Sequence, residues 1–380
     1  MDEIVVDPDR QKKAKEYAII SRRLFVVELA IGLLYILAWL IFEWAISLRN
    51  FILEWTNNPW WIVILFAACF GCIYYLVGLP INYYQSYVLP HRYEMSTQNV
   101  KRWIIDEVKS LIIGGFLVGL VIEMIYAVLR IAPNTWWLWA AGLLLVFNVL
   151  LANLAPVLLF PIFYKFKPLD EEQNDLEQRL VQLAKRTNTD VRGVFKFDMS
   201  SRTKAANAAL TGLGNTRRII VGDTLISEFN VDEIESIMAH ELGHHVHKDI
   251  PLGILIQSVL TMSGLYVASV FLRLGVGILG MEGLADIAGL PVFLLAIGLF
   301  GLITMPLGNA FSRWRERRAD QFALEMTGNG HVYATALKRL ANQNLAETDP
   351  DPWVVFLLNS HPPLNQRIAF AEMWKKGEAS

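Results

Sequence analysis

Long apolar stretches alternate with polar ones along this chain. Six windows hold about 20 consecutive, almost uncharged residues, the length that a helix needs to cross the hydrocarbon core of a bilayer. They are residues 24–46, 60–79, 111–129, 136–160, 252–272 and 287–308. Tryptophan pairs at Trp60-Trp61 and Trp136-Trp137 begin two of these windows, as is typical of a membrane–water interface. The pattern therefore predicts a mainly α, polytopic membrane protein with six spans.

The polar stretches between the windows divide the chain into segments. We expect an N-terminal arm, a four-span region with one polar connection, a polar segment large enough to fold, two further spans and a C-terminal segment. Their predicted bounds are 1–23, 24–160 with the connection at 80–110, 161–251, 252–311 and 312–380.

The polar segment at 161–251 predicts a small mixed structure. Residues 170–186 have helical periodicity with a charged face, whereas 191–197 and 218–221 are short and β-branched enough to be strands. A further helix is expected after Asn230, because this residue can cap a helix and two acidic residues follow in its first turn. We therefore expect a helical domain that contains a small β-sheet.

Composition agrees with a membrane protein, and the charge distribution orients it. The chain is 54% hydrophobic and only 18% charged, with a net charge of -2. That balance excludes a disordered chain and a nucleic-acid binder that depends on a large positive excess. With six alternating spans, 31 of the 34 lysine and arginine residues fall on one side of the membrane, all except Arg49, Arg130 and Arg273. The positive-inside rule then places both termini and the polar segments in the cytoplasm.

A metal-binding pattern lies on the helix that follows Asn230. His240 and His244 are four residues apart, so that their imidazoles share one helical face and offer two zinc ligands. Glu241 between them is placed to accept a proton from an attacking water. Chance could produce this five-residue pattern in roughly 1% of such chains, so the pattern needs a third ligand to support it.

The third ligand of a catalytic zinc site has one candidate downstream. A histidine six residues after His244 is excluded, because Ile250 stands there. Glu316 follows the sixth window, and Asp320 lies one helical turn further on the same face. One carboxylate can bind metal while the other accepts a hydrogen bond from a ligating imidazole. The alternative is that Glu316 forms surface ion pairs with its arginine neighbours.

Four motifs in this order resemble the CAAX prenyl protease 1 family of integral-membrane zinc metalloproteases. They are residues 92–98 (RYEMSTQ) with Asp106 and Lys109; Ser200-Ser201, Asn207-Ala208 and 218–225; the histidine motif with 316–320; and 360–364 (SHPPL) with Arg367. The chain departs from the family at Glu94, where glycine is usual.

This resemblance implies a gluzincin-type zinc protease domain and assigns roles to its residues. One zinc ion per chain is expected on His240, His244 and Glu316, with Glu241 as general base and Asp320 as the partner of a ligating histidine. The further residues that the resemblance implicates are His361 and Arg367, near the substrate or the developing oxyanion, and Asn207 and Ala208, on an edge that pairs with extended substrate. Without the resemblance, His361 would be interpreted as an exposed turn residue before two prolines.

The predicted function is that of a zinc-dependent, membrane-embedded metalloendopeptidase at the cytoplasmic membrane face. Its predicted partners are the lipid bilayer and a peptide or protein substrate. That substrate is either prenylated or associated with the membrane in another way, and no nucleic acid is expected to bind. A prokaryotic plasma membrane is expected, with the endoplasmic reticulum as the eukaryotic alternative. The sequence predicts no oligomeric state.

Two other functions remain open at this point, and a third is set aside. A quality-control protease resembling HtpX would use the same chemistry, but it would lack the region 79–109. Site-two intramembrane proteases need an Asp-Gly motif in a later span, and the spans here have none. A non-catalytic protein with structural zinc would need a fourth ligand from His245, His247 or His361.

Overall fold

Six long apolar helices dominate the fold. The computed structural model describes residues 4–212 and 216–375; residues 1–3, 213–215 and 376–380, which belong to the predicted N-terminal arm, middle segment and C-terminal segment, lie outside the described residues. Six helices in the described chain are long and apolar enough to cross a membrane, which confirms the six predicted spans. The long helices are α1 (Pro8–Ile41), α3 (Pro59–Tyr83), α5 (Val100–Ile131), α6 (Trp136–Leu154), α11 (Asp249–Ile278) and α12 (Leu290–Thr327).

Shorter elements connect the long helices and form the polar part of the protein. Two π-helical turns, Tyr84–Val88 and Ala155–Leu159, extend α3 and α6. The short helices are α2 (Trp44–Leu53), α4 (Leu89–Arg92), α7 (Phe160–Phe163), α8 (Asn174–Arg186), α9 (Asp223–Glu228), α10 (Val231–Val246), α13 (Gly330–Gln343), α14 (Pro352–Leu357) and α15 (Leu364–Met373). The strands are β1 (Phe166–Pro168), β2 (Val194–Phe197), β3 (Ala208–Thr211) and β4 (Arg218–Gly222).

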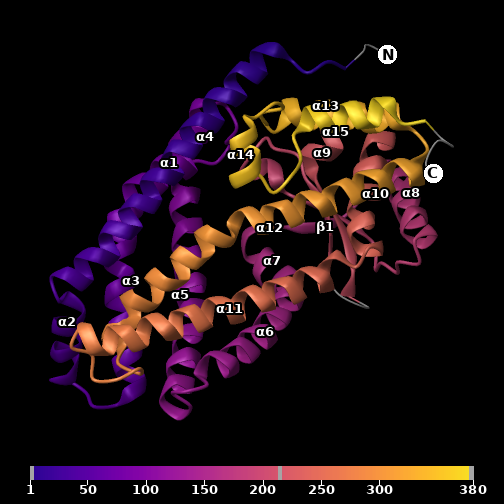
Figure 1. The fold of residues 1–380 in the computed structure, drawn as a ribbon. Coiled ribbons are helices and arrows are strands. Elements are labelled where there is room, and N and C mark those ends of the chain that lie inside the picture. Colours follow the sequence, from indigo (N-terminus) through magenta and orange to yellow (C-terminus); the bar gives the residue numbers. More distant parts are fainter. Residues whose placement is uncertain (1–3, 213–215, 376–380) are drawn as a thin grey trace.

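The long helices pack in a closed circuit. In the order α1, α3, α5, α6, α11 and α12, each helix contacts the next, and α12 also contacts α1. Figure 1 shows the polar elements at one end of this circuit, with α2 at the opposite end. A core near α2 that includes Phe66, Tyr126, Trp136 and Leu272 joins the helices there. The fold thus holds the polar domain on a closed set of helices.

The first span ends earlier than its apolar window predicted. The window runs to residue 46, but α1 ends at Ile41 and Glu43 adopts a left-handed conformation with φ 56° before α2 begins. An apolar window contains no information on backbone dihedrals, so this turn was missed. At its other end α1 begins at Pro8, and Arg22 forms a 2.7 Å ion pair with Glu347. The predicted arm is therefore largely the start of α1, bound to the C-terminal segment.

A four-stranded sheet lies in the polar domain. Its order is β1-β2-β4-β3, with β2 and β4 parallel in the centre and antiparallel strands at both edges. The two predicted strands are the central pair, whereas the edge strands were not predicted. β1 has only three residues and ends in proline, and β3 is the alanine-rich AALT, so neither has a strong strand signal. The sheet packs with α8, α10 and α13 on one core that includes Leu180, Ile219 and Met238.

Candidate active site

The predicted start of α10 at Asn230 is confirmed by its capping contacts. The Asn230 side chain accepts a 2.9 Å hydrogen bond from the Glu233 N–H, and the Glu233 carboxylate accepts a 3.0 Å bond from the Asn230 N–H. This capping box fixes where the helix begins. Ten residues later His240 follows, and His244 lies one turn beyond it with its ring centroid 4.8 Å from that of His240.

α10 packs closely against the part of α12 that carries the candidate third ligand. α12 is continuous from the sixth apolar window through Glu316 and Asp320, so these carboxylates stand on a rigid helix. A Cβ built on Gly243 would lie 3.1 Å from the Ala319 Cα and 3.2 Å from Phe322. Only glycine fits this approach without displacement, and the approach brings Glu316 to the histidines.

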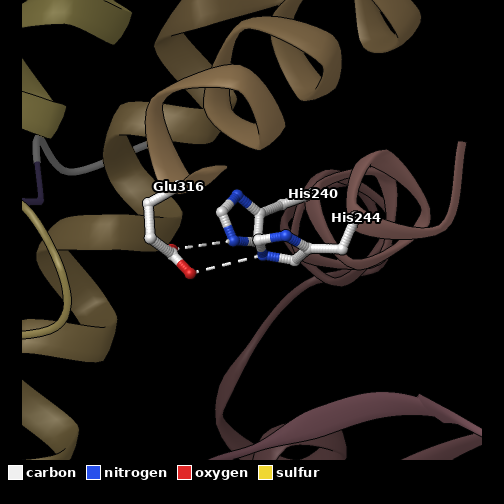
Figure 2. A group of neighbouring side chains, drawn as sticks. All are labelled: His240, His244 and Glu316. Carbon is white, nitrogen blue, oxygen red and sulfur yellow. Dashed lines mark ion pairs between the residues drawn. The ribbon is translucent and has the colours of Figure 1, made fainter. Parts of the chain in front are cut away.

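The carboxylate of Glu316 faces both imidazoles (Figure 2). Its two oxygens lie 3.3 Å from His240 Nε2 and 3.3 Å from His244 Nε2. The three side chains offer ligand atoms that all lie within 4.8 Å of one another. His240 and Glu316 are buried, and Glu316 Oε2 has no hydrogen-bond partner among the described residues despite its burial. A buried, unsatisfied carboxylate oxygen is costly unless another group binds it.

The outer nitrogens of both imidazoles contact carboxylates. His240 Nδ1 lies 2.9 Å from Asp320 Oδ1, and His244 Nδ1 lies 2.8 Å from Asp249 Oδ2. Both aspartates are almost completely buried. A proton on each Nδ1 would satisfy these carboxylates and leave each Nε2 lone pair directed at Glu316. Two imidazole nitrogens and one carboxylate are a set that catalytic zinc sites use, so the residues present fit such a metal.

Arg367 and Tyr333 hold Asp320 in place. Arg367 donates two hydrogen bonds to Asp320, 2.9 Å from Nε and 2.6 Å from Nη2, and the Tyr333 hydroxyl donates a third of 2.6 Å. The hydroxyl also lies 3.1 Å from His240 Nδ1. Arg367 Nη1 is 3.9 Å from Glu316 Oε2. The arginine thus orients the carboxylate network and also lines the adjoining cavity.

A cavity of about 530 Å³ opens beside these residues. Glu241 lines it, and no hydrogen bond to the Glu241 carboxylate is formed by any residue within 4–212 or 216–375. Burial raises the pKa of this carboxyl group above its ordinary value, although the neighbouring imidazoles act to lower it. His361 lines the same cavity with its side chain 60% exposed and its Nε2 3.3 Å from Glu316 Oε1.

An edge of the sheet borders the cavity. Asn207 and Ala208 both line it, and among the strands of the described residues β3 pairs with β4 alone. The Gly222 N–H donates to the Asn207 carbonyl, and Ala208 is opposite Val221. In this register the main-chain groups of Ala208 and Leu210 point away from β4. The edge therefore offers hydrogen-bonding groups beside the candidate metal ligands.

The structure brings together all of the residues that the sequence implicated. It also adds two that the sequence analysis missed, Asp249 and Tyr333. Asp249 follows His244 by only five residues, but the chain turns at Lys248 with φ 56° and the periodicity of α10 does not extend to it. Tyr333 arrives from α13 and has no motif of its own. Among the described residues that could hold a metal ion, His245, His247 and His361 do not join the group of three.

Comparisons with known proteins agree with this geometry. Residues 170–375 match the model of peptidase family M48, and residues 3–165 match the model described as CAAX prenyl protease N-terminal, five membrane helices. The chain is 32% identical to the uncharacterized metalloprotease YhfN of Bacillus subtilis over 311 residues, which are 81% of this chain and 72% of that protein. It is 29% identical over 311 residues to CAAX prenyl protease 1 of Saccharomyces cerevisiae, covering 77% of this chain and 68% of the relative.

A solved structure has the same fold. The crystal structure of Ste24p from S. mikatae superimposes with a TM-score of 0.86, and the match covers 98% of this chain and 90% of that chain at 23% identity. The arrangement of spans and polar domain is therefore shared along nearly the whole chain.

Proposed function

The chain belongs to peptidase family M48 and is a multi-span membrane metalloprotease that resembles CAAX prenyl proteases, and we propose that it works with one zinc ion held by His240, His244 and Glu316. One observation carries this proposal: two imidazole Nε2 atoms face one buried carboxylate at 3.3 Å, and Glu241 lines the same cavity. Three protein ligands would leave a zinc ion able to bind water or substrate, as a catalytic site requires and a closed structural site does not.

The chemistry divides between the metal and Glu241. A zinc ion bound at such a site polarises a carbonyl group and lowers the pKa of water toward ~7. Glu241 accepts the proton of the attacking water and later donates it to the departing amine. Its raised pKa suits both steps, because a carboxyl group that binds a proton more readily also holds it until the amine departs.

The surrounding side chains have separate roles in the proposal. Asp320 and Asp249 orient the two ligating imidazoles, and Arg367 acts through Asp320 as a positioning residue. His361 has an exposed side chain that lines the cavity, so we assign it to the carbonyl oxygen of the substrate, where it stabilises the developing negative charge.

The substrate is proposed to be an extended peptide segment of a membrane-associated protein. The outward main-chain groups of Ala208 and Leu210 would pair with such a segment, and the side chain of Asn207 lies beside it. The relatives named CAAX prenyl protease 1 and the match of residues 3–165 favour prenylated substrates over the misfolded membrane proteins of an HtpX-like enzyme.

The site is proposed to face the cytoplasm. The supporting observation is the charge distribution, because 31 of the 34 basic residues fall on the side of the polar segments. We retain the plasma membrane of a prokaryote as the proposed location, with the endoplasmic reticulum as the eukaryotic alternative.

The proposed chemistry is tested by Glu241→Gln. This variant keeps the size of the side chain but cannot accept the proton, so cleavage should fall by at least about 100-fold while about one zinc per chain is retained. Zinc content is measured by elemental analysis, and cleavage is measured with a peptide whose fluorescence is quenched until it is cut. Activity equal to that of the wild type would contradict the role of Glu241, and full zinc content in His240→Ala would contradict the ligand assignment.

The substrate class is tested by comparing two peptides. A prenylated C-a-a-X peptide and the same peptide without its lipid are incubated with the enzyme, with and without a zinc chelator. The proposal expects chelator-sensitive cleavage of both, with the prenylated peptide preferred. Equal cleavage rates would contradict the preference for prenylated substrates without affecting the protease assignment.

A further inference from the structure

A second cavity lies at the C-terminal end of the metal-binding helix, where α10 leads into α11. It has a volume of about 570 Å³, and His244 contributes to its wall. One part of its lining is basic and the other is apolar. The residues that define these parts are Arg217, His245 and Lys248, and then Ile250, Pro251 and Ile254.

The basic part has no acidic partner. Within residues 4–212 and 216–375, neither Arg217 nor Lys248 forms a side-chain ion pair or hydrogen bond. Arg202, another basic residue of the polar domain, is by contrast paired with Asp106 at 2.9 Å. Two cations and an imidazole that share one cavity without a carboxylate favour an anionic ligand.

The apolar part belongs to a membrane span. Ile250, Pro251 and Ile254 lie in the first turns of α11, the fifth candidate span, and the Ile250 side chain is 42% exposed. Because the predicted span begins at residue 252, the cavity lies where the hydrocarbon core gives way to the headgroups. A ligand that fills both parts has an anionic group and an apolar chain next to each other.

We propose that this cavity binds an anionic phospholipid of the surrounding leaflet. Arg217 and Lys248 contact the phosphate, His245 donates a hydrogen bond to it, and an acyl chain follows Ile250 and Ile254. Basic pockets at the ends of spans recognise phosphate headgroups in this way. Basic residues in a loop also orient a membrane protein, but that effect depends only on their number. It does not require them to line one cavity together with apolar side chains.

The experiment titrates the full-length, delipidated protein in detergent with short-chain phosphatidylglycerol, phosphatidylcholine or soluble glycerol phosphate. Binding is followed by native mass spectrometry and by the shift in melting temperature. We expect phosphatidylglycerol to bind at least tenfold more tightly than the other two ligands. The double variant Arg217→Gln/Lys248→Gln should bind phosphatidylglycerol at least tenfold more weakly than the wild type. The charge-preserving double variant Arg217→Lys/Lys248→Arg should bind it with the affinity of the wild type.

A matched control separates this site from the general surface charge. Lys13→Gln/Lys101→Gln removes the same charge from two exposed residues outside the cavity and should leave binding unchanged. Equal affinity for phosphatidylglycerol and phosphatidylcholine would overturn the proposal. An equal loss of phosphatidylglycerol affinity in the Arg217/Lys248 and Lys13/Lys101 glutamine variants would also overturn it. If glycerol phosphate binds as tightly as phosphatidylglycerol, the cavity binds a soluble phosphate and the lipid proposal is wrong. If the glutamine pair does not fold, Ile250→Gln, which changes only the apolar wall, must weaken lipid binding for the proposal to stand.

Discussion

Gly243 of α10 lies directly against the main chain of Ala319 in α12, with only 3.1 Å between the Ala319 Cα and the place that a Cβ on Gly243 would occupy. The two histidines are on the first helix, and Glu316 and Asp320 are on the second. The separation of these helices therefore sets the distances in the candidate metal site. This relationship makes a packing residue a determinant of activity.

Gly243→Ala should lower metal affinity and cleavage together. The new methyl group would push α10 from α12 by a few tenths of an ångström, and displacements of that order at a catalytic site reduce rates by about tenfold or more. Gly301→Ala in α12 is the control, since a Cβ there meets nothing within 4 Å and alanine favours the helix. Both variants are assayed for cleavage and zinc affinity. Normal activity in Gly243→Ala would show that the site tolerates a wider separation.

Tyr333→Phe should weaken metal binding although Tyr333 is not a proposed ligand. Its hydroxyl donates a 2.6 Å hydrogen bond to Asp320 and lies 3.1 Å from His240 Nδ1. Loss of such a partner typically costs about 10–100-fold in metal affinity. Zinc dissociation constants measured by competition with a chromogenic chelator test this. Tyr266→Phe removes the hydroxyl group of an exposed tyrosine and serves as the control; equal affinities in both variants would contradict a role for the Tyr333 hydroxyl.

The local part of this site was predictable from sequence, and Glu316 and Asp320 were found by the need for a third ligand, whereas the contacts of Tyr333 were not predictable. Helical periodicity places His240 and His244 on one face, and the Asn230 cap marks where their helix begins, because both depend on neighbours within a few residues. Tyr333 reaches His240 from 93 positions away, and no local pattern specifies that contact. The turn at Glu43 was missed for a related reason, since apolar windows contain no information on φ.

Metal affinity should fall as the pH is lowered. In protein stripped of metal by a chelator, burial lowers the pKa of His240, but the close contacts with the carboxylates of Asp320 and Glu316 outweigh this effect and raise the pKa to about 9. Zinc must displace this proton below pH 9, so the apparent affinity should drop about tenfold per pH unit between pH 8 and 6. A slope near zero would contradict a protonated His240.

The same raised pKa has a consequence for the stripped protein. Stability from the protonated imidazole is fully present below the ordinary pKa of 6.5 and is lost as the pH rises through about 9. The melting temperature of the stripped protein should therefore fall between pH 7 and 9.5, and the zinc-loaded protein should show a smaller change.

Glu94→Gly should stabilise the protein. Glu94 has φ 59° and is exposed at the end of α4. The Met95 N–H donates a 2.8 Å hydrogen bond to the Pro90 carbonyl, and the Glu94 N–H donates one of 3.0 Å to the His91 carbonyl. These two bonds define a Schellman motif, whose left-handed position favours glycine. This geometry explains why glycine is usual in the related family. Relief of the left-handed strain, partly offset by the entropy of the unfolded glycine, should give about 0.5–1 kcal/mol.

A gain of that size corresponds to a rise in melting temperature of about 1–2 °C in a chain of this length. Glu94→Ala is the matched control, because it removes the same carboxylate but retains the Cβ that makes a positive φ unfavourable. If both variants gain equally, the carboxylate and not the backbone conformation is the source of the effect. If neither gains, the hydrogen bonds of the motif already compensate for the strain at Glu94.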